Sequence, residues 1–208
     1  PPSPEGTTGK GAGCLDNACA FLDHIYVSRV PSIFKNRLDE GVEEGFSRAV
    51  LIKLGLFLRG YDPLEFSQLA EKLRLSRKSS RLLTEIQLLS EKRFSEWSNL
   101  QCGERGRALW VEALGRHPLE LLLALAALKA GDAEQALRFV EQAGGIFLRY
   151  SGGKPLPDLV EARVLQQHGV PEKTLSRVMK AIRDEEIAGR VNSVEEALDF
   201  VRALGKRD

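Results

Sequence analysis

Apolar residues recur along the chain at intervals of three and four positions, the spacing that places side chains on one face of an α-helix. No segment alternates between apolar and polar residues over the length of a strand, so the pattern predicts helices and no sheet. The expected fold is all-α: a multi-helix orthogonal bundle with a smaller C-terminal helical tail. The predicted helices cover residues 15–25, 38–58, 63–73, 76–89, 104–114, 119–129, 133–150, 159–167, 172–187 and 194–204. For the helix that starts at Ser76, a continuation to Trp97 is the alternative.

Residues that end and start helices divide the chain into parts. Gly60 is suited to end the second predicted helix, and Ser193 with Glu196 forms a capping box ahead of the last one. The strongest internal break is the stretch 151–157, which reads Ser-Gly-Gly-Lys-Pro-Leu-Pro. We therefore expect a flexible linker or cut site over residues 1–13, a helical body over 14–150 and a helical tail over 151–208.

The composition favours a folded, cytoplasmic protein. The longest apolar run, residues 119–128, is interrupted by Glu120 and is shorter than the about 20 residues that cross a bilayer, so it predicts a buried helix. Cys14, Cys19 and Cys102 match neither zinc-site nor redox-motif spacing, and we expect reduced thiols. No signal peptide is visible and the first residue is Pro, so we expect the chain to begin within a longer protein.

A search for chemistry finds no catalytic or metal-binding pattern. His24, His117 and His168 are scattered, and none has a second metal ligand three or four residues away. The glycine-rich stretch near the start lacks the strand that precedes a phosphate-binding loop. The acidic pair Glu185-Glu186 is interpreted as part of a solvated helix face. We expect no catalytic residue, no metal and no cofactor in this chain.

Any basic surface has to be local, because 30 Lys and Arg residues stand against 29 Asp and Glu residues and the net charge is +1. The first basic cluster lies at residues 72–81, where two short helices meet at a turn around Ser76, as in a helix-turn-helix corner. The start of the second helix, with Arg77, Lys78 and Arg81, is suited to bind phosphate. The alternative is a packed corner with solvated charges.

A second basic cluster lies on the helix predicted over residues 172–187. Lys173, Arg177, Lys180 and Arg183 follow one another at intervals of four, three and three residues, which places them on one helical face. The acidic residues 184–186 follow, so a solvated face is again the alternative. Two such clusters on one chain favour a grip on a nucleic-acid backbone, with Lys173, Arg177 and Lys180 as the contacts from the tail.

The order of residues around these clusters is itself informative. The tail stretch 160–182 contains Leu165-Gln166-Gln167-His168-Gly169-Val170-Pro171 and is followed by Ile187-Ala188-Gly189-Arg190-Val191 and Ser193-Val194-Glu195-Glu196-Ala197-Leu198. Upstream lie Leu69-Ala70-Glu71-Lys72-Leu73-Arg74-Leu75-Ser76 and Arg81-Leu82-Leu83. Together, over Ser47 to Leu204, they resemble the body and tail of class II tRNA nucleotidyltransferases and bacterial poly(A) polymerases. Val164 departs from the Asp that this family favours, and Glu172-Lys173-Thr174 replaces its Pro-Gly-Pro.

The resemblance implies a division of labour. In this family the body and tail hold the acceptor and T arms of tRNA, while a head and neck perform nucleotide transfer with Mg²⁺ and ATP or CTP. This sequence contains no Gly-Gly-x-Val-Arg-Asp stretch, no Asp-x-Asp pair and no Glu-Asp-x-x-Arg motif, so the head is absent from it. The implied role is an RNA-positioning module that does not catalyse transfer alone, with tRNA or another structured RNA and the head and neck of the same parent as its partners.

Two other functions stay open. The corner at residues 72–81 also suits a regulatory or DNA-binding helix-turn-helix module, although nothing resembles a wing or a duplicated half-site. A helical scaffold for protein interactions is the third reading, and the absence of a fixed-period repeat weighs against it.

Overall fold

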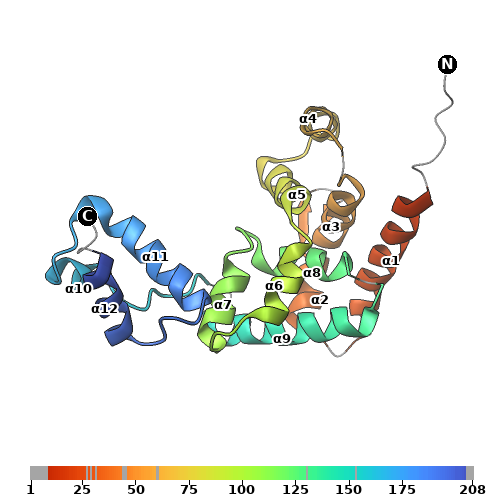
Figure 1. Ribbon diagram of the computed structural model, residues 1–208. Helices are drawn as coiled ribbons and strands as arrows, with labels where there is room; N and C mark the ends of the chain where they lie inside the picture. The colour runs from red at the N-terminus through yellow and green to blue at the C-terminus, as the bar shows by residue number, and fades with distance from the viewer. Residues whose placement is uncertain are drawn as a thin grey trace, which may run out of the picture. The chain divides into compact units, whose positions relative to one another are not determined.

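The computed structural model describes residues 9–26, 28, 30, 32–43, 46–59, 61–129, 131–152 and 154–204. Within these residues the chain is predominantly helical, which confirms the all-α prediction (Figure 1). The helices of the first part are α1 (Gly9–Ile25), α2 (Ser32–Asp39), α3 (Arg48–Phe57), α4 (Pro63–Lys72), α5 (Arg77–Leu88) and α6 (Lys92–Asn99). Those that follow are α7 (Glu104–Glu112), α8 (Pro118–Ala127), α9 (Ala133–Ser151), α10 (Ala162–Gln167), the 3-10 turn η1 (Glu172–Thr174), α11 (Leu175–Ile187) and α12 (Val194–Leu204).

One predicted helix is wrong, and so is the prediction of no sheet. Residues 38–58 do not form a single helix, because α2 ends at Asp39 and α3 begins at Arg48. Between them, β1 (Gly41–Glu43) pairs antiparallel with β2 (Phe46–Ser47). Ser47 explains the new start: its backbone is extended, and its side chain accepts a hydrogen bond from the amide of Val50, as an N-cap does.

Two further boundaries differ from the prediction. Residues 9–13, expected in the linker, belong to α1, because adding a residue to a helix that has already nucleated supplies one more hydrogen bond. The rest of that expected linker, residues 1–8, lies outside the described residues. The helix predicted from Ser76 ends at Leu88, since Leu89 is extended, and α6 begins separately at Lys92.

The chain divides into two compact units, each described by itself. The first comprises Pro1–Phe94 and Leu114–Gly145, and the second comprises Ser95–Ala113 and Ile146–Asp208. This division groups α7 with the tail helices, a grouping that the sequence did not indicate.

In the first unit α3 is the central helix and packs against α1, α2, α5 and α8. Its Gly55 permits a close approach to α5, because a Cβ there would lie 3.0 Å from the Ile86 side chain. The helix α8 is buried from Leu119 to Ala127, as its apolar run predicts. No helix in the described part of the chain is both long and apolar enough to cross a membrane.

An ion-pair network lies within this apolar core. Glu120 of α8 is 1% exposed, and its Oε1 accepts hydrogen bonds from Arg48 Nη1 and from Arg37 Nε. Arg48, 2% exposed, also donates from Nε and Nη2 to the two carboxylate oxygens of Glu40, each at 3.0 Å. The network therefore joins α8, α3 and α2 by charges rather than by apolar contact alone.

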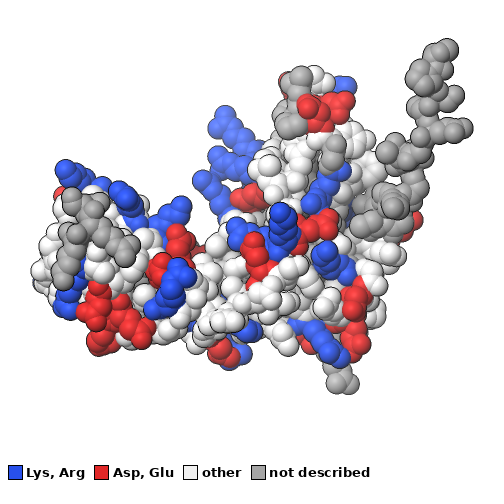
Figure 2. Space-filling model, in the orientation of Figure 1, with Lys and Arg blue, Asp and Glu red and all other residues white. Residues whose placement is uncertain are grey.

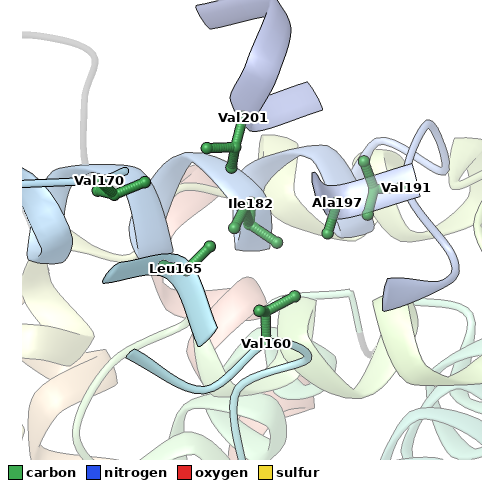
Figure 3. Packing of buried hydrophobic residues seen from close by; sticks show 7 residues of the cluster. All are labelled: Val160, Leu165, Val170, Ile182, Val191, Ala197 and Val201. Carbon is green, nitrogen blue, oxygen red and sulfur yellow. The ribbon is translucent and has the colours of Figure 1, made fainter. Parts of the chain in front are cut away.

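The second unit has its own small core, in which α10, α11 and α12 pack together. Its side chains converge between these helices (Figure 3). They are Val160, Leu165, Val170, Ile182, Val191, Ala197 and Val201. The helix α7 packs against α11, and the ring of Trp110 of α7 lies tilted against that of Trp97 of α6, with 5.5 Å between the ring centroids.

Candidate nucleic-acid interface

The first basic cluster forms a tight corner between α4 and α5. Lys72 is the last residue of α4, and Arg77 is the first of α5. Ser76 is the N-cap of α5, with its side chain accepting a hydrogen bond from the amide of Ser79 at 3.3 Å. We call the cations of this segment the basic corner: Lys72, Arg74, Arg77, Lys78 and Arg81.

Arg74 has an unusual backbone within this corner. Its φ is 51°, the left-handed conformation, and it is the one non-glycine residue with positive φ in the described part of the chain. Its amide donates to Glu71, and the next amide, of Leu75, donates to Ala70 at 3.1 Å, which closes α4. A glycine is the usual occupant, since a side chain costs about 1–2 kcal/mol in this conformation. The position therefore carries a cation where the fold alone favours glycine.

The five cations of the basic corner are exposed and unpaired. All of them lie on the surface, and none forms an ion pair or a side-chain hydrogen bond with another described residue. Figure 2 shows Lys and Arg side chains projecting together from the surface beside α5. The charge of Lys78 acts on Glu40, whose pKa is lowered chiefly by hydrogen bonds from Arg48, with a smaller contribution from Lys78.

The second cluster presents a smaller set, which we call the tail basic face: Lys173, Arg177 and Lys180. Lys173 lies in η1, and the other two lie on α11. The three side chains are exposed, and none is paired with another described residue. Figure 2 shows Lys and Arg side chains spaced along α11. All six residues predicted as phosphate contacts are therefore free to meet a ligand.

Arg183 shares the sequence spacing of this face but has a different role. Its Nε donates to Asp158 at 2.8 Å, its Nη1 pairs with Glu112, and its Nη2 donates to the Leu156 carbonyl at 2.7 Å. Burial would lower the pKa of Arg183, but these two carboxylates outweigh burial and raise it. Arg183 therefore belongs to the packing of the second unit.

The acidic residues after the tail basic face are also not what the sequence suggested. The interpretation of Glu185-Glu186 as a solvated face is wrong. Glu186 is 2% exposed and accepts a hydrogen bond from Arg105 of α7, whereas Glu185 is bound by Arg190. The missed signal is the helical period, because Glu186 follows the core residue Ile182 by four positions and so shares its buried face.

No described part of the chain assembles a metal site from three or more His, Cys, Asp or Glu side chains. The His117 ring lies 2.9 Å from Glu85, whose other oxygen accepts a hydrogen bond from the Arg116 amide, so this carboxylate joins α5 to the start of α8.

Compared with models of protein families, with curated proteins and with solved structures, the chain shows no significant match. The resemblance to nucleotidyltransferases stays a prediction.

Proposed function

We propose that this chain binds structured RNA by its phosphates, as the body and tail part of a template-independent nucleotidyltransferase. The observation that carries the proposal is the basic corner: five exposed cations within ten residues, none paired with a described residue. Most other described arginines are engaged in ion pairs, for example Arg37, Arg48 and Arg183.

A phosphate backbone suits this arrangement for two reasons. Exposed Lys and Arg side chains that need no internal partner can neutralise phosphates, and each contact releases counterions. Double-helical RNA offers side chains a poorly readable major groove, so binding depends mainly on phosphates and 2′-hydroxyls. The tail basic face supplies a second set of the same chemistry, and the resemblance to the nucleotidyltransferase tail points to the acceptor and T arms of tRNA.

A DNA-binding module is the second candidate, and one observation favours it. The ten-residue α4 and the twelve-residue α5 are joined by a turn of four residues, Leu73–Ser76, a length that occurs in helix-turn-helix units. In such units the start of the second helix reads base edges in the major groove.

Fluorescence anisotropy with labelled nucleic acids tests the proposal. Two triple variants are compared with the parent chain: Arg77→Ala/Lys78→Ala/Arg81→Ala and Lys173→Ala/Arg177→Ala/Lys180→Ala. Each should weaken binding to a tRNA and reduce the slope of log K against log salt by up to about 2–3 units if all three side chains touch phosphate.

The matched control removes the same number of positive charges from exposed arginines that already have acidic partners. These are Arg138, Arg149 and Arg202, bound to Glu134, Glu104 and Asp199. The control should bind like the parent chain. Equal losses of tRNA affinity in all three variants would show that only the net charge of the chain matters. Unchanged affinity in both test variants would refute the proposal. Tighter binding to duplex DNA of the same sequence would favour the second candidate.

A further inference from the structure

We propose that Glu186 is a proton-operated latch in the joint between α7 and α11. In this proposal Glu186 binds a proton more tightly while the two helices are packed, and the joint weakens as rising pH removes that proton. The group lies outside both basic sets and forms no part of the proposed RNA contacts.

The two helices approach each other closely beside Glu186. A Cβ on Gly106 of α7 would lie 2.5 Å from the backbone carbonyl oxygen of Glu186, so only glycine fits there. Gly189, just after α11, has a φ of 73°, and a Cβ on it would lie 2.5 Å from the carbonyl oxygen of Gln101. The backbones on both sides of this joint are therefore in close contact next to Glu186, whose side chain is buried.

The carboxylate is only half satisfied. Arg105 donates from Nε to its Oε2 at 2.9 Å, but Oε1 is buried with no hydrogen-bond partner among the described residues. The small cavity beside it, lined by Asp158, Met179 and Arg183 among others, has no space for a water molecule. A buried charged oxygen without a partner is costly, and a proton removes that cost.

The surrounding charges do not supply the missing partner. Arg105 donates from Nη2 to the Pro157 carbonyl at 2.7 Å and not to Oε1 of Glu186. Arg183 is held by Asp158 and Glu112. Asp158 lines the same cavity as Glu186, so a second negative charge faces it.

These causes set the sign of the pH dependence. Burial, the largest cause, raises the pKa of Glu186 above its usual 4.5, Asp158 adds to the rise, and Arg105 and Arg183 oppose it. The folded state therefore keeps a proton that the unfolded state releases. The stabilisation is complete below pH 4.5 and is lost as pH rises through the raised pKa of the folded state.

The chain contains a reporter placed for this test. Its two tryptophans, Trp97 and Trp110, both lie in the second unit, and Trp110 is on α7 itself. Tryptophan fluorescence during thermal unfolding therefore follows the unit that contains the latch. The melting temperature is measured between pH 5 and pH 8, above the usual glutamate pKa of 4.5.

The parent chain should lose thermal stability from pH 5 to pH 8. Glu186→Gln, which is neutral at every pH, should remove this loss and melt on the order of 3 °C higher than the parent at pH 8. Glu185→Gln is the matched control, because the pKa of Glu185 is lowered by its hydrogen bond from Arg190. This variant should therefore lose thermal stability from pH 5 to pH 8 as the parent chain does. His168→Gln, which replaces the histidine of the second unit, should also preserve the loss.

Two results would overturn the proposal: a melting temperature of the parent chain that stays constant or rises from pH 5 to pH 8, or a Glu186→Gln profile parallel to that of the parent. The first result is measured on the parent chain alone, so it does not depend on whether a variant folds. Because α11 carries Arg177 and Lys180, a looser joint would also affect RNA binding, a consequence that rests on the proposed function. The unfolding experiment contains no RNA, so its failure is distinguishable from failure of the RNA proposal.

Discussion

Replacing Arg48 with Met would leave a negative charge inside the first unit. The Arg48 and Glu120 side chains are only 3% and 1% exposed, and Arg48 is the more deeply buried of the two arginines bound to Oε1 of Glu120. Oε2 of Glu120 already lacks a hydrogen-bond partner among the described residues. Removing one partner of a buried pair costs about 3–5 kcal/mol, and the part-exposed Arg37 is expected to keep the loss at the lower end.

Replacing Glu120, the other member of the pair, should reduce the free energy of unfolding by less, because Arg48 has a second acidic partner. In Glu120→Leu, Arg48 still donates to both carboxylate oxygens of Glu40, so only its Nη1 loses a partner. One unsatisfied buried donor costs about 1–3 kcal/mol. The double variant Arg48→Met/Glu120→Leu removes both charges and should be more stable than Arg48→Met alone.

Urea unfolding followed by far-ultraviolet circular dichroism measures these free energies. The parent chain should be the most stable, followed by Glu120→Leu and then by Arg48→Met. The double variant should be more stable than Arg48→Met. A decrease in the free energy of unfolding of less than about 1 kcal/mol for Arg48→Met would show that water reaches the Glu120 carboxylate. A greater cost for Glu120→Leu than for Arg48→Met would refute the assignment of Glu40 as the second anchor.

Two other replacements test backbone conformation by thermal unfolding. Arg74→Gly should stabilise the chain by about 0.5–1 kcal/mol, because relief of about 1–2 kcal/mol of left-handed strain exceeds the added freedom of glycine in the unfolded state; a lower melting temperature would contradict this. Gly189→Ala should destabilise the second unit by at least about 1–2 kcal/mol, since it adds that strain and a Cβ 2.5 Å from the Gln101 carbonyl oxygen; an unchanged Trp-detected melting temperature would contradict it.

Long helices with strong apolar stripes were predictable from the sequence, and short extended segments were not. The run over residues 119–128 indicated a buried helix, and α8 is buried throughout. The strands β1 and β2 contain three and two residues, too few to show alternation against the helical pattern around them. Their pairing depends on a reversal of the chain between α2 and α3, which periodicity does not encode.

Candidate phosphate contacts were predictable only as residue types. Lys180 and Arg183 lie three residues apart on one helix and look equivalent in the sequence. Arg183 is bound by Asp158 and Glu112, which are 25 and 71 residues distant in the sequence, whereas Lys180 has no described partner. Ion pairing between distant segments decides which cations remain available, and only the folded chain brings such segments together.

A net charge of +1 is therefore compatible with a polyanionic partner. Several acids lie within hydrogen-bonding distance of a cation of the same chain, so the two opposite charges largely cancel at distances much greater than their separation. The unpaired cations of the basic corner keep their field, because no described acid forms an ion pair with them. Each triple variant and the triple control change the net charge equally, from +1 to −2, since three positive charges are removed from each. A difference in RNA affinity between them must come from where the charges lie, and that is the quantity on which the proposed function depends.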